Sequence, residues 1–457
     1  MATFKNIFNN MQLAEKGDTK PIKKLGGLTA NFTGQKFSQK YLDTFFQIAE
    51  DEKIIERFAE IYSGKKVNKT EGRAVGHFEY RKKRNKRLES VLKEQEKMYG
   101  LAERILQKQY HALIFIGIGG SQLGPELLQQ AINVSGANNI LFITSPESGD
   151  LERLALLRAE NRINECAFII ASKSFSTLET LEAYRRLIDW KMLNNENTYA
   201  ITANKKAAQE FGVPDKNILT FGETVGGRYS IWSPINLLSA VQGGSNSVED
   251  FAIGGFEADE NILNTSSLED ILSIYMSAQD ILHNNILKNE TTAILSYEWG
   301  LRDFYKYAQQ LEMESNGKQI NQNGEKVDYQ TNSIIWGGYG PVSQHSFYQQ
   351  IFQGTKDINL YFLAITKNDT LSKAQYLAQT KSLSEGTESK EPPHKQTNKR
   401  RFTTIEMSLS EPTAREMGNL IATWENKTIL NSLIWNINAF DQWGVELGKA
   451  NTKWNPL

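Results

Sequence analysis

The sequence predicts an α/β protein with two units, each built on a mainly parallel sheet that helices cover on both faces. Short apolar runs alternate along the chain with stretches of helical periodicity, and this alternation occurs twice. The runs are apolar throughout instead of at every second residue, which is typical of strands buried on both faces. Helices between such strands supply the crossovers of a doubly wound sheet.

The first group of elements predicts a unit at about residues 45–245, preceded by an N-terminal segment at 1–44. Strands are expected at 112–118, 140–144, 167–171, 198–202 and 218–221, with helices at 125–132 and 178–193.

The second group predicts a unit at about residues 265–435. Strands are expected at 292–296, 333–336, 360–366 and 402–406, with helices at 301–313 and 344–352. The polar segment 382–400 is expected to be a long surface loop. The stretch 423–454 is expected to be helical and to pack against the rest of the protein. Residues 436–457 are expected to form a C-terminal segment that carries Lys449.

Composition excludes several classes of protein. Lys plus Arg number 52 and Asp plus Glu 53, so the net charge of −1 argues against a polyanion-binding protein. The basic run 81–87 has no interleaved aromatic residues, and a solvated helix face is favoured over a nucleic-acid site. A single cysteine and five dispersed histidines indicate neither a disulfide nor a metal site. Without a signal peptide or a long apolar run, we expect a cytoplasmic protein with no membrane partner.

The segment GIGGSQLGPELL, residues 117–128, leads from a predicted strand into a helix. Glycines allow the backbone to approach a ligand, and the start of a helix offers N–H groups to an anion or hydroxyl. The dinucleotide pattern GxGxxG fails in both frames, because Gln122 or Ser121 stands where a glycine is needed. A plain tight turn between strand and helix remains the alternative.

The segment SKSFST, residues 172–177, directly follows the predicted strand 167–171 and offers a lysine and four hydroxyls, those of Ser172, Ser174, Ser176 and Thr177. Ligands of open α/β sheets bind at this end of the strands. Short donors beside a helix N-terminus favour a phosphate. As an alternative role for Ser176, the spacing to Glu179 matches a capping box, so Ser176 could simply start the helix.

Four further residues could contribute chemistry. Arg228 follows two glycines and is an always-charged donor that could stabilise an oxyanion, although a surface arginine is equally compatible. Glu314 is expected at the end of a helix, where the negative dipole end favours basicity; a solvated glutamate is the alternative. Ser343 is a plausible N-cap, which would put His345 in a first helical turn and keep it neutral. Lys449 alone reads as a surface lysine.

Taken together and in this order, the motifs resemble the phosphoglucose isomerase family. The resemblance begins at NKTEGRAVGHFEYR (residues 68–81), continues through GIGGS, SKSFST, GGRYSIWS, MESNGK and QHSFYQ, and ends at FDQWGVELGK. It implies two sugar-isomerase (SIS) domains and interconversion of glucose 6-phosphate and fructose 6-phosphate in glycolysis and gluconeogenesis. It also implies that no metal or organic cofactor is used, and that the protein is a homodimer whose histidine reaches into the partner's site.

The resemblance assigns roles by position. Glu314 would move a proton between C2 and C1 through an enediol(ate), and Arg228 would stabilise the negative charge on that intermediate. His345 and Lys449 would assist opening of the sugar ring. The remaining matched positions would bind the substrate; they are Gly120, Ser121, Ser172, Lys173, Ser174, Thr177, Gln310 and Gln442.

Two departures from the family pattern keep alternatives open. Gln122 stands where the family usually has Asp after GIGGS, and residues 337–345 read GGYGPVSQH where GTNGQH is usual before the histidine. The second departure motivates an isomerase that also accepts mannose 6-phosphate. A non-catalytic SIS sugar-phosphate sensor is the other alternative, but it predicts loss of the base or the histidine, and both residues are present.

Overall fold

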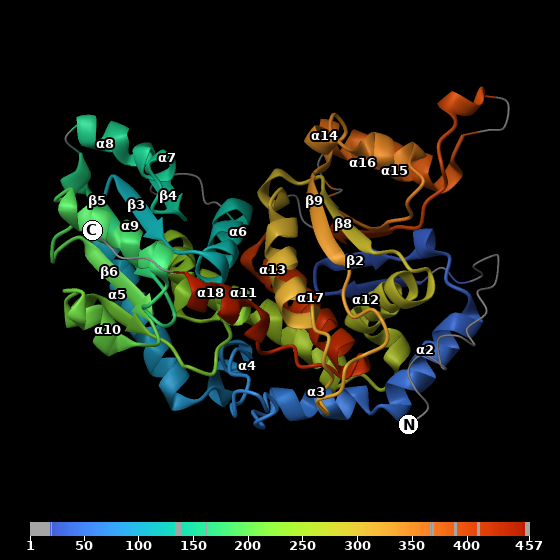
Figure 1. The fold of residues 1–457 in the computed structure, drawn as a ribbon, viewed down its shortest axis with the longest axis horizontal. Coiled ribbons are helices and arrows are strands. Elements are labelled where there is room, and N and C mark those ends of the chain that lie inside the picture. Colours follow the sequence, from blue (N-terminus) through green and yellow to red (C-terminus); the bar gives the residue numbers. More distant parts are fainter. Residues whose placement is uncertain are drawn as a thin grey trace. The chain divides into compact units, whose positions relative to one another are not determined.

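The computed structural model describes residues 19, 21–132, 139–160, 162–365, 367, 370–387, 391–408 and 412–452 (Figure 1). The chain divides into two compact units. Unit 1 contains the described residues of Met1–Glu71 together with Gly254–Asp441, and unit 2 contains Gly72–Ile253 with those of Gln442–Leu457. The chain therefore passes between the units after Glu71, after Ile253 and after Asp441.

Unit 2 is built on a five-stranded sheet in which each strand is parallel to its neighbours. The strand order is β4-β3-β5-β6-β7, with β3 (Ala112–Ile116), β4 (Asn139–Ile143), β5 (Cys166–Ala171), β6 (Thr198–Thr202) and β7 (Ile218–Thr220). These are the five strands expected from the first group of apolar runs. The order is that of a doubly wound, flavodoxin-like sheet.

The helices of unit 2 lie between these strands and at both ends of its sequence. They are α4 (Phe78–Arg81), α5 (Glu89–Gln107), α6 (Leu123–Ala131), α7 (Ser148–Leu151), α8 (Ala155–Ala159), α9 (Leu178–Asp189), α10 (Lys205–Glu210), α18 (Glu446–Asn451) and the first part of α11 (Leu237–Leu263). The unit also has short 3-10 helices, at Arg84–Lys86, Gly119–Ser121, Glu152–Leu154, Ile163–Glu165, Asp215–Asn217, Gly227–Trp232, Pro234–Asn236 and Trp443–Val445.

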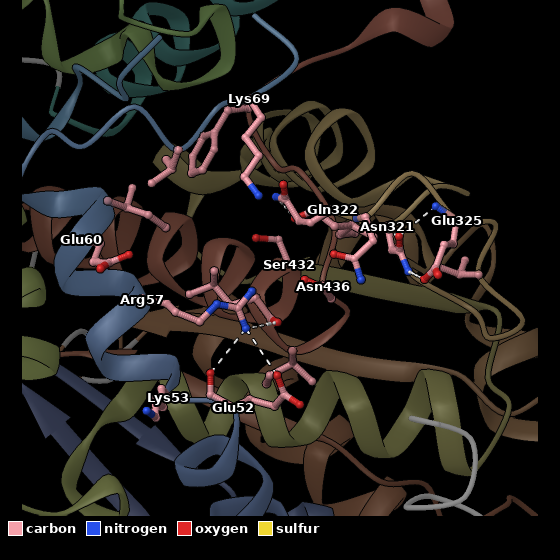
Figure 2. Close-up of a pocket in the computed structure, with 18 of the residues that line it drawn as sticks. Glu52, Lys53, Arg57, Glu60, Lys69, Asn321, Gln322, Glu325, Ser432 and Asn436 are labelled. Atoms are coloured by element: carbon pink, nitrogen blue, oxygen red, sulfur yellow. Dashed lines mark hydrogen bonds and ion pairs between the residues drawn. The ribbon is translucent and has the colours of Figure 1, made fainter. Parts of the chain in front are cut away.

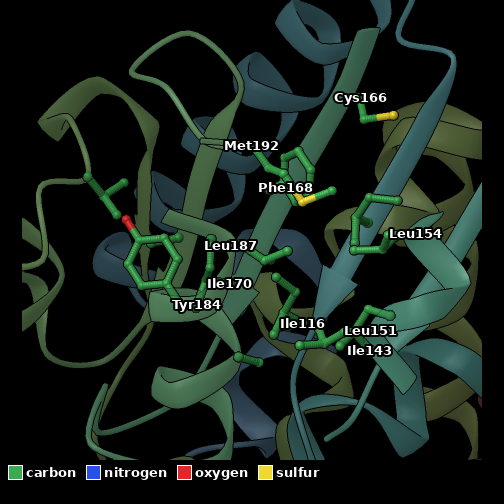
Figure 3. Packing of buried hydrophobic residues seen from close by; sticks show 14 of the residues in the cluster. Ile116, Ile143, Leu151, Leu154, Cys166, Phe168, Ile170, Tyr184, Leu187 and Met192 are labelled. Carbon is green, nitrogen blue, oxygen red and sulfur yellow. The ribbon is translucent and has the colours of Figure 1, made fainter. Parts of the chain in front are cut away.

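The sheet of unit 2 is buried on both faces. Ile116 of β3 and Phe168 of β5 belong to a buried apolar cluster that includes Leu187 of α9 (Figure 3). Phe115 and Ile169 are the neighbouring residues on the same strands, so their side chains point to the opposite face, and they are also fully buried. This explains why the strands are apolar at every position.

Unit 1 is built on a six-stranded sheet with the order β1-β2-β11-β10-β8-β9. Its parallel part consists of β8 (Thr291–Ser296), β9 (Ile334–Tyr339), β10 (Asn359–Ile365) and β11 (Thr403–Met407), which match the second group of predicted strands. The predicted strand residue 366 lies outside the described residues. An antiparallel hairpin, β1 (Ile22–Leu25) and β2 (Leu28–Asn31), extends this sheet through pairing of β2 with β11.

The helices of unit 1 are α2 (Gln39–Asp51), α3 (Ile54–Tyr62), α12 (Leu272–Ile281), α13 (Phe304–Asn316), α14 (Gly340–Ser343), α15 (Tyr348–Gln353), α16 (Leu371–Glu385), α17 (Ala414–Ile434) and the last part of α11. It also has 3-10 helices at Thr33–Gln35, Leu268–Asp270, Trp299–Leu301 and Pro393–Lys395, and a π-helical turn at Leu282–Ile286. Within the described ranges, no helix of either unit is long and apolar enough to cross a bilayer.

The grouping of residues into units differs from the consecutive ranges 45–245 and 265–435. Residues 45–71 belong with the second sheet, because α3 packs against α17 and the preceding hairpin extends that sheet. The residues after Asp441 belong with the first sheet.

The C-terminal helical prediction is wrong in its extent. Helix α17 begins at Ala414, where Thr413 and Glu416 form a capping box, and it ends at Ile434. Asn436 then adopts a left-handed conformation with φ of 51°, and irregular chain follows before the last short helices. The expected loop at 382–400 begins with the final turn of α16 and contains a 3-10 helix, while its residues 388–390 lie outside the described residues.

Candidate active site

Two of the predicted ligand-binding turns lie side by side at the topological switch point of unit 2. GIGGS follows β3 and SKSFST follows β5, and these two strands are adjacent in the sheet. A Cβ atom placed on Gly117 would lie 3.1 Å from the carbonyl oxygen of Ala171, which shows how closely the two turns approach. Ligands of doubly wound sheets bind at this point, so the turns form the expected place for a small-molecule anion.

The hydroxyls of the 172–177 turn are held by one another. Ser172 is buried, and its Oγ lies 3.0 Å from Oγ1 of Thr177; the hydroxyl of Ser176 donates to that of Ser174 at 2.6 Å. The turn is anchored to the end of β6, because the backbone carbonyl of Lys173 accepts a hydrogen bond of 3.0 Å from Thr202. The turn therefore presents a preformed group of short donors.

The predicted capping role of Ser176 is wrong. Helix α9 begins at Leu178, so Thr177 occupies the N-cap position, and no side chain caps the helix. The hydroxyl of Thr177 instead contacts Ser172. The positive end of the α9 dipole therefore lies next to the hydroxyl turn without a side-chain cap, an arrangement that suits a phosphate.

Arg228 lies against the GIGGS turn. Its side chain is 3 % exposed, and Nη1 donates to Oε1 of Gln442 at 2.9 Å. The turn and the arginine segment are further joined by Ser230, whose hydroxyl donates to the carbonyl of Gly120 at 3.2 Å. Unit 2 thus brings together three of the predicted residues, Gly120, Arg228 and Gln442, while Ser121 is the last residue of the same short 3-10 helix.

A side chain at Gly120 should disturb this arrangement. A Cβ atom there would lie 2.1 Å from the carbonyl oxygen of Gly227 and 2.8 Å from the backbone nitrogen of Arg228, so backbone must move. We expect Gly120→Ala to cost about 1–3 kcal/mol of unfolding free energy and to lower kcat/KM, measured by denaturant titration and steady-state kinetics. Gly227→Ala is the matched stability control, since its Cβ meets nothing within 4 Å. Equal unfolding midpoints for the two variants would contradict this prediction.

Lys449 lies on α18, the last helix of unit 2. Its side chain is exposed, and Nζ forms an ion pair of 2.8 Å with Glu446 one turn earlier. Exposed pairs of this kind contribute little free energy, so the pair with Glu446 costs little to break.

Glu314 lies near the end of α13 in unit 1, as the sequence predicts. Its side chain is half-buried, and Nε2 of Gln310 donates to Oε1 of Glu314 at 3.4 Å from the preceding turn. Helix spacing of four residues puts the two side chains on one face. Gln310 and Glu314 are therefore brought together within unit 1.

The structure corrects the prediction for His345. Ser343 is the last residue of α14 instead of an N-cap, and His345 lies in the turn before α15, where its side chain is exposed. The carbonyl of Ser343 accepts from the backbone N–H groups of Ser346 and Phe347 at 2.9 and 3.1 Å. The proposed effect of a helix N-terminus on the imidazole therefore does not apply.

Within unit 1, Glu314 and His345 lie beyond opposite ends of the edge strand β9. Helix α13 runs antiparallel to β9, since Gln309 donates to the carbonyl of Ile335 at 2.7 Å and Tyr305 lies beside Gly337. Glu314 therefore lies beyond the start of β9 and His345 beyond its end. With rises of about 1.5 Å per helical residue and about 3.3 Å per strand residue, Glu314 lies roughly 20 Å from the end of β9 at Tyr339, and His345 follows that end.

Unit 1 has a cavity of about 960 Å³, and none of the predicted site residues lines it. Its walls come from α3, from the 321–329 loop and from the chain around the end of α17 (Figure 2). Arg57 points into it, and its guanidinium donates to the carbonyls of Leu433 at 3.1 Å and Glu52 at 3.4 Å. Burial lowers the pKa of Arg57.

The described residues contain no cluster of three or more His, Cys, Asp or Glu side chains that could hold a metal ion.

Comparison with known proteins gives one consistent family. The model of the phosphoglucose isomerase family matches residues 31–454. The chain is 31% identical to a glucose-6-phosphate isomerase of Ectopseudomonas mendocina over 499 aligned positions, which cover 97% of this chain and 89% of that protein. It is 33% identical to the enzyme of that name from Xanthomonas euvesicatoria pv. vesicatoria, covering 94% and 87%.

A solved structure shows the same fold. The crystal structure of a glucose-6-phosphate isomerase from Chlamydia trachomatis superposes with a TM-score of 0.84 at 24% identity, covering 97% of this chain and 91% of that one. The family match over nearly the whole chain, the relatives and this fold agree. The chain belongs to the phosphoglucose isomerase family.

Proposed function

We propose that this protein interconverts glucose 6-phosphate and fructose 6-phosphate, the reaction that places its relatives in glycolysis and gluconeogenesis. The observation that carries the proposal is the family match over residues 31–454, which contains the motifs from GIGGS to FDQWGVELGK in the order given above. Aldose–ketose isomerisation needs a base that reaches two adjacent carbons, a cation near their oxygens, and an anchor for the phosphate. This chain offers a residue or turn for each task.

The phosphate would bind at the 172–177 turn and the uncapped start of α9. Ser172, Ser174 and Thr177 would donate hydroxyls, Lys173 would add a positive charge, and Gly120 and Ser121 would contact the ligand through the adjacent turn. Binding energy from this remote group would hold the reacting carbons in place. This site lies entirely on elements of unit 2.

Glu314 would then remove the proton from C2 and deliver it to C1, while a proton exchange between the oxygens completes the isomerisation. The guanidinium of Arg228 would stabilise the negative charge of the enediolate, as a fixed cation in a site that excludes water. Gln310 and Gln442, which hydrogen-bond to Glu314 and Arg228, would line the site. His345 and Lys449 would move protons during ring opening.

We further propose that the enzyme is a cytoplasmic homodimer with shared active sites. The position of Glu314 and His345 beyond opposite ends of β9 within one unit supports this proposal, because a second copy could supply the histidine. Isologous dimers exchange the same residue in both directions, so two complete sites would form.

Mixing two inactive variants tests the shared site. Glu314→Gln and His345→Asn should each be inactive alone, but a mixed dimer would contain one site with both native residues. After denaturation and joint refolding, we expect about a quarter of the wild-type activity, since half of randomly formed dimers are mixed. Separately refolded variants that are then combined without subunit exchange are the control. A mixture as inactive as its components would refute sharing.

The proposed reaction is tested by a coupled assay of fructose 6-phosphate conversion in the presence of a chelator. Formation of glucose 6-phosphate at unchanged rate with chelator is the expected result. Mannose 6-phosphate formation would identify the broader isomerase that the 341–343 sequence favours. Fructose 6-phosphate binding in calorimetry without any turnover would identify a sensor and reject the proposed enzyme.

A further inference from the structure

Lys318, the lysine of MESNGK, folds back over the end of α13. Its Nζ lies 2.9 Å from the backbone carbonyl oxygens of both Glu314 and Ser315. These carbonyls belong to the last helical turn, where no intrahelical donor is available. The same Nζ contacts the carbonyl oxygens of Asn438 at 3.0 Å and Asp441 at 2.8 Å. One ammonium group therefore joins the turn that bears Glu314 to the 438–441 segment.

Asp441 completes a buried polar cluster around this lysine. Its carboxylate lies 3.3 Å from Lys318 Nζ and accepts hydrogen bonds from the amide of Asn438, at 2.7 Å, and from the hydroxyl of Thr70. The amide of Asn438 also donates to Oδ1 of Asn68 at 2.9 Å. Asn68, Asn438 and Asp441 are all buried. A buried network in which each member is paired fixes the geometry of its members.

The cluster holds the chain where it leaves unit 1. Asp441 is the last residue of that unit, and the next residue, Gln442, accepts the 2.9 Å hydrogen bond from Arg228 within unit 2. Asp441, which pairs with Lys318, is thus joined by one peptide bond to Gln442, which accepts from Arg228. Asn68 likewise donates to Glu71, the last residue before another crossing, at 2.8 Å.

We propose that Lys318 is a positioning residue for the reaction: it fixes the last turn of α13, and with it Glu314, against the 438–441 segment of unit 1. This inference rests on the proposed function. The cluster also places two opposite charges at the helix end, the ammonium of Lys318 and the carboxylate of Asp441, which lie 3.3 Å apart. Other charges nearby are Glu71, bonded to Asn68, and Glu312 with Lys427 on the buried side of α13.

Two substitutions, each of which removes one of the two opposite charges, test the proposal. Lys318→Met should lower kcat by about 10–100-fold with a smaller change in KM, because the base is displaced. It should also shift the acidic limb of the pH profile of kcat upward by about 0.3–0.7 pH unit. Asp441→Asn should shift that limb downward. Lys318→Arg should restore the limb, and Lys326→Met, at an exposed lysine of the following loop, should behave as wild type.

The sign of the shifts separates positioning from general loosening. A purely structural role predicts lower thermal stability for both variants with no opposed movement of the acidic limb, and that result would overturn the proposal. A kcat for Lys318→Met within twofold of wild type would also overturn it. If Lys318→Met does not fold, the pH profile of Asp441→Asn alone tests the proposal. A downward shift of its acidic limb supports the proposal, and an unchanged or upward-shifted limb overturns it. Wild-type protein without isomerase activity would instead reject the proposed function.

Discussion

Replacing Glu314 by glutamine is expected to reduce kcat by about 10²–10⁴-fold or more, with little change in KM. Glutamine keeps the shape of the side chain and its contact with Gln310, but it cannot accept a proton from C2. Substrate affinity should persist, because the turn at 172–177, where we propose that the phosphate binds, is not altered. Exchange of the C2 hydrogen with solvent deuterium should fall in parallel with kcat, and this exchange measures the assigned step directly.

Two further variants complete this experiment. Glu314→Asp keeps a carboxylate but withdraws it by about one bond length, so we expect an intermediate loss, on the order of 10²-fold. Glu325→Gln removes an exposed carboxylate from the loop that follows α13 and should leave kcat unchanged. A near-wild-type rate of exchange in Glu314→Gln would show that another group is the base.

Replacing Lys427 by methionine is expected to destabilise the protein by about 3–5 kcal/mol. Lys427 on α17 is fully buried, and its Nζ lies 2.9 Å from Asp280 of α12 and 2.8 Å from Glu312 of α13. Burial opposes the charge on Lys427, but the two carboxylates outweigh this and raise its pKa. Without the ammonium, two buried carboxylates would face each other uncompensated.

The effect on stability can be separated from loss of an ordinary ion pair. Lys93→Met removes an exposed lysine that pairs with Glu89, and it should cost less than about 1 kcal/mol. Adding Glu312→Gln to Lys427→Met should recover part of the loss, because one buried charge is removed; burial already raises the pKa of Glu312. Denaturant midpoints that are equal for Lys427→Met and Lys93→Met would refute this account.

Most of the fold could be predicted because its strands are short, apolar and separated by helical periodicity. The nine parallel strands lie within a few residues of their predicted ranges. The β1–β2 hairpin was not predicted, since its strands have only four residues each and β1 is partly exposed, leaving only the Gly26–Gly27 turn as a signal. Its pairing with β11 joins residues that lie 373 to 379 positions apart in the sequence, which no local pattern contains.

The candidate site, like the fold, has features that local sequence predicts and features that it does not. The motifs predict Glu314, Arg228 and the hydroxyl turn as site residues, because each combines a strand or helix end with recognisable chemistry; their roles stay a prediction. The capping role of Ser176 and the helical setting of His345 were wrong, since helix ends depend on backbone contacts with neighbouring turns. Lys318 and Asp441 lie inside two of the motifs, yet nothing in their local sequence indicates that they meet.

The sequence by itself determined two α/β units with mainly parallel sheets, the order of the motifs and the family, because apolar periodicity and local residue chemistry are properties of short segments. Tertiary structure alone decided which distant residues became neighbours. In the folded chain, Gly120 packs against Arg228, and Lys427 lies between two buried carboxylates. Glu314 and His345 lie beyond opposite ends of β9. Such contacts arise from the packing of elements far apart in the chain, where burial and charge compensation outweigh local preference.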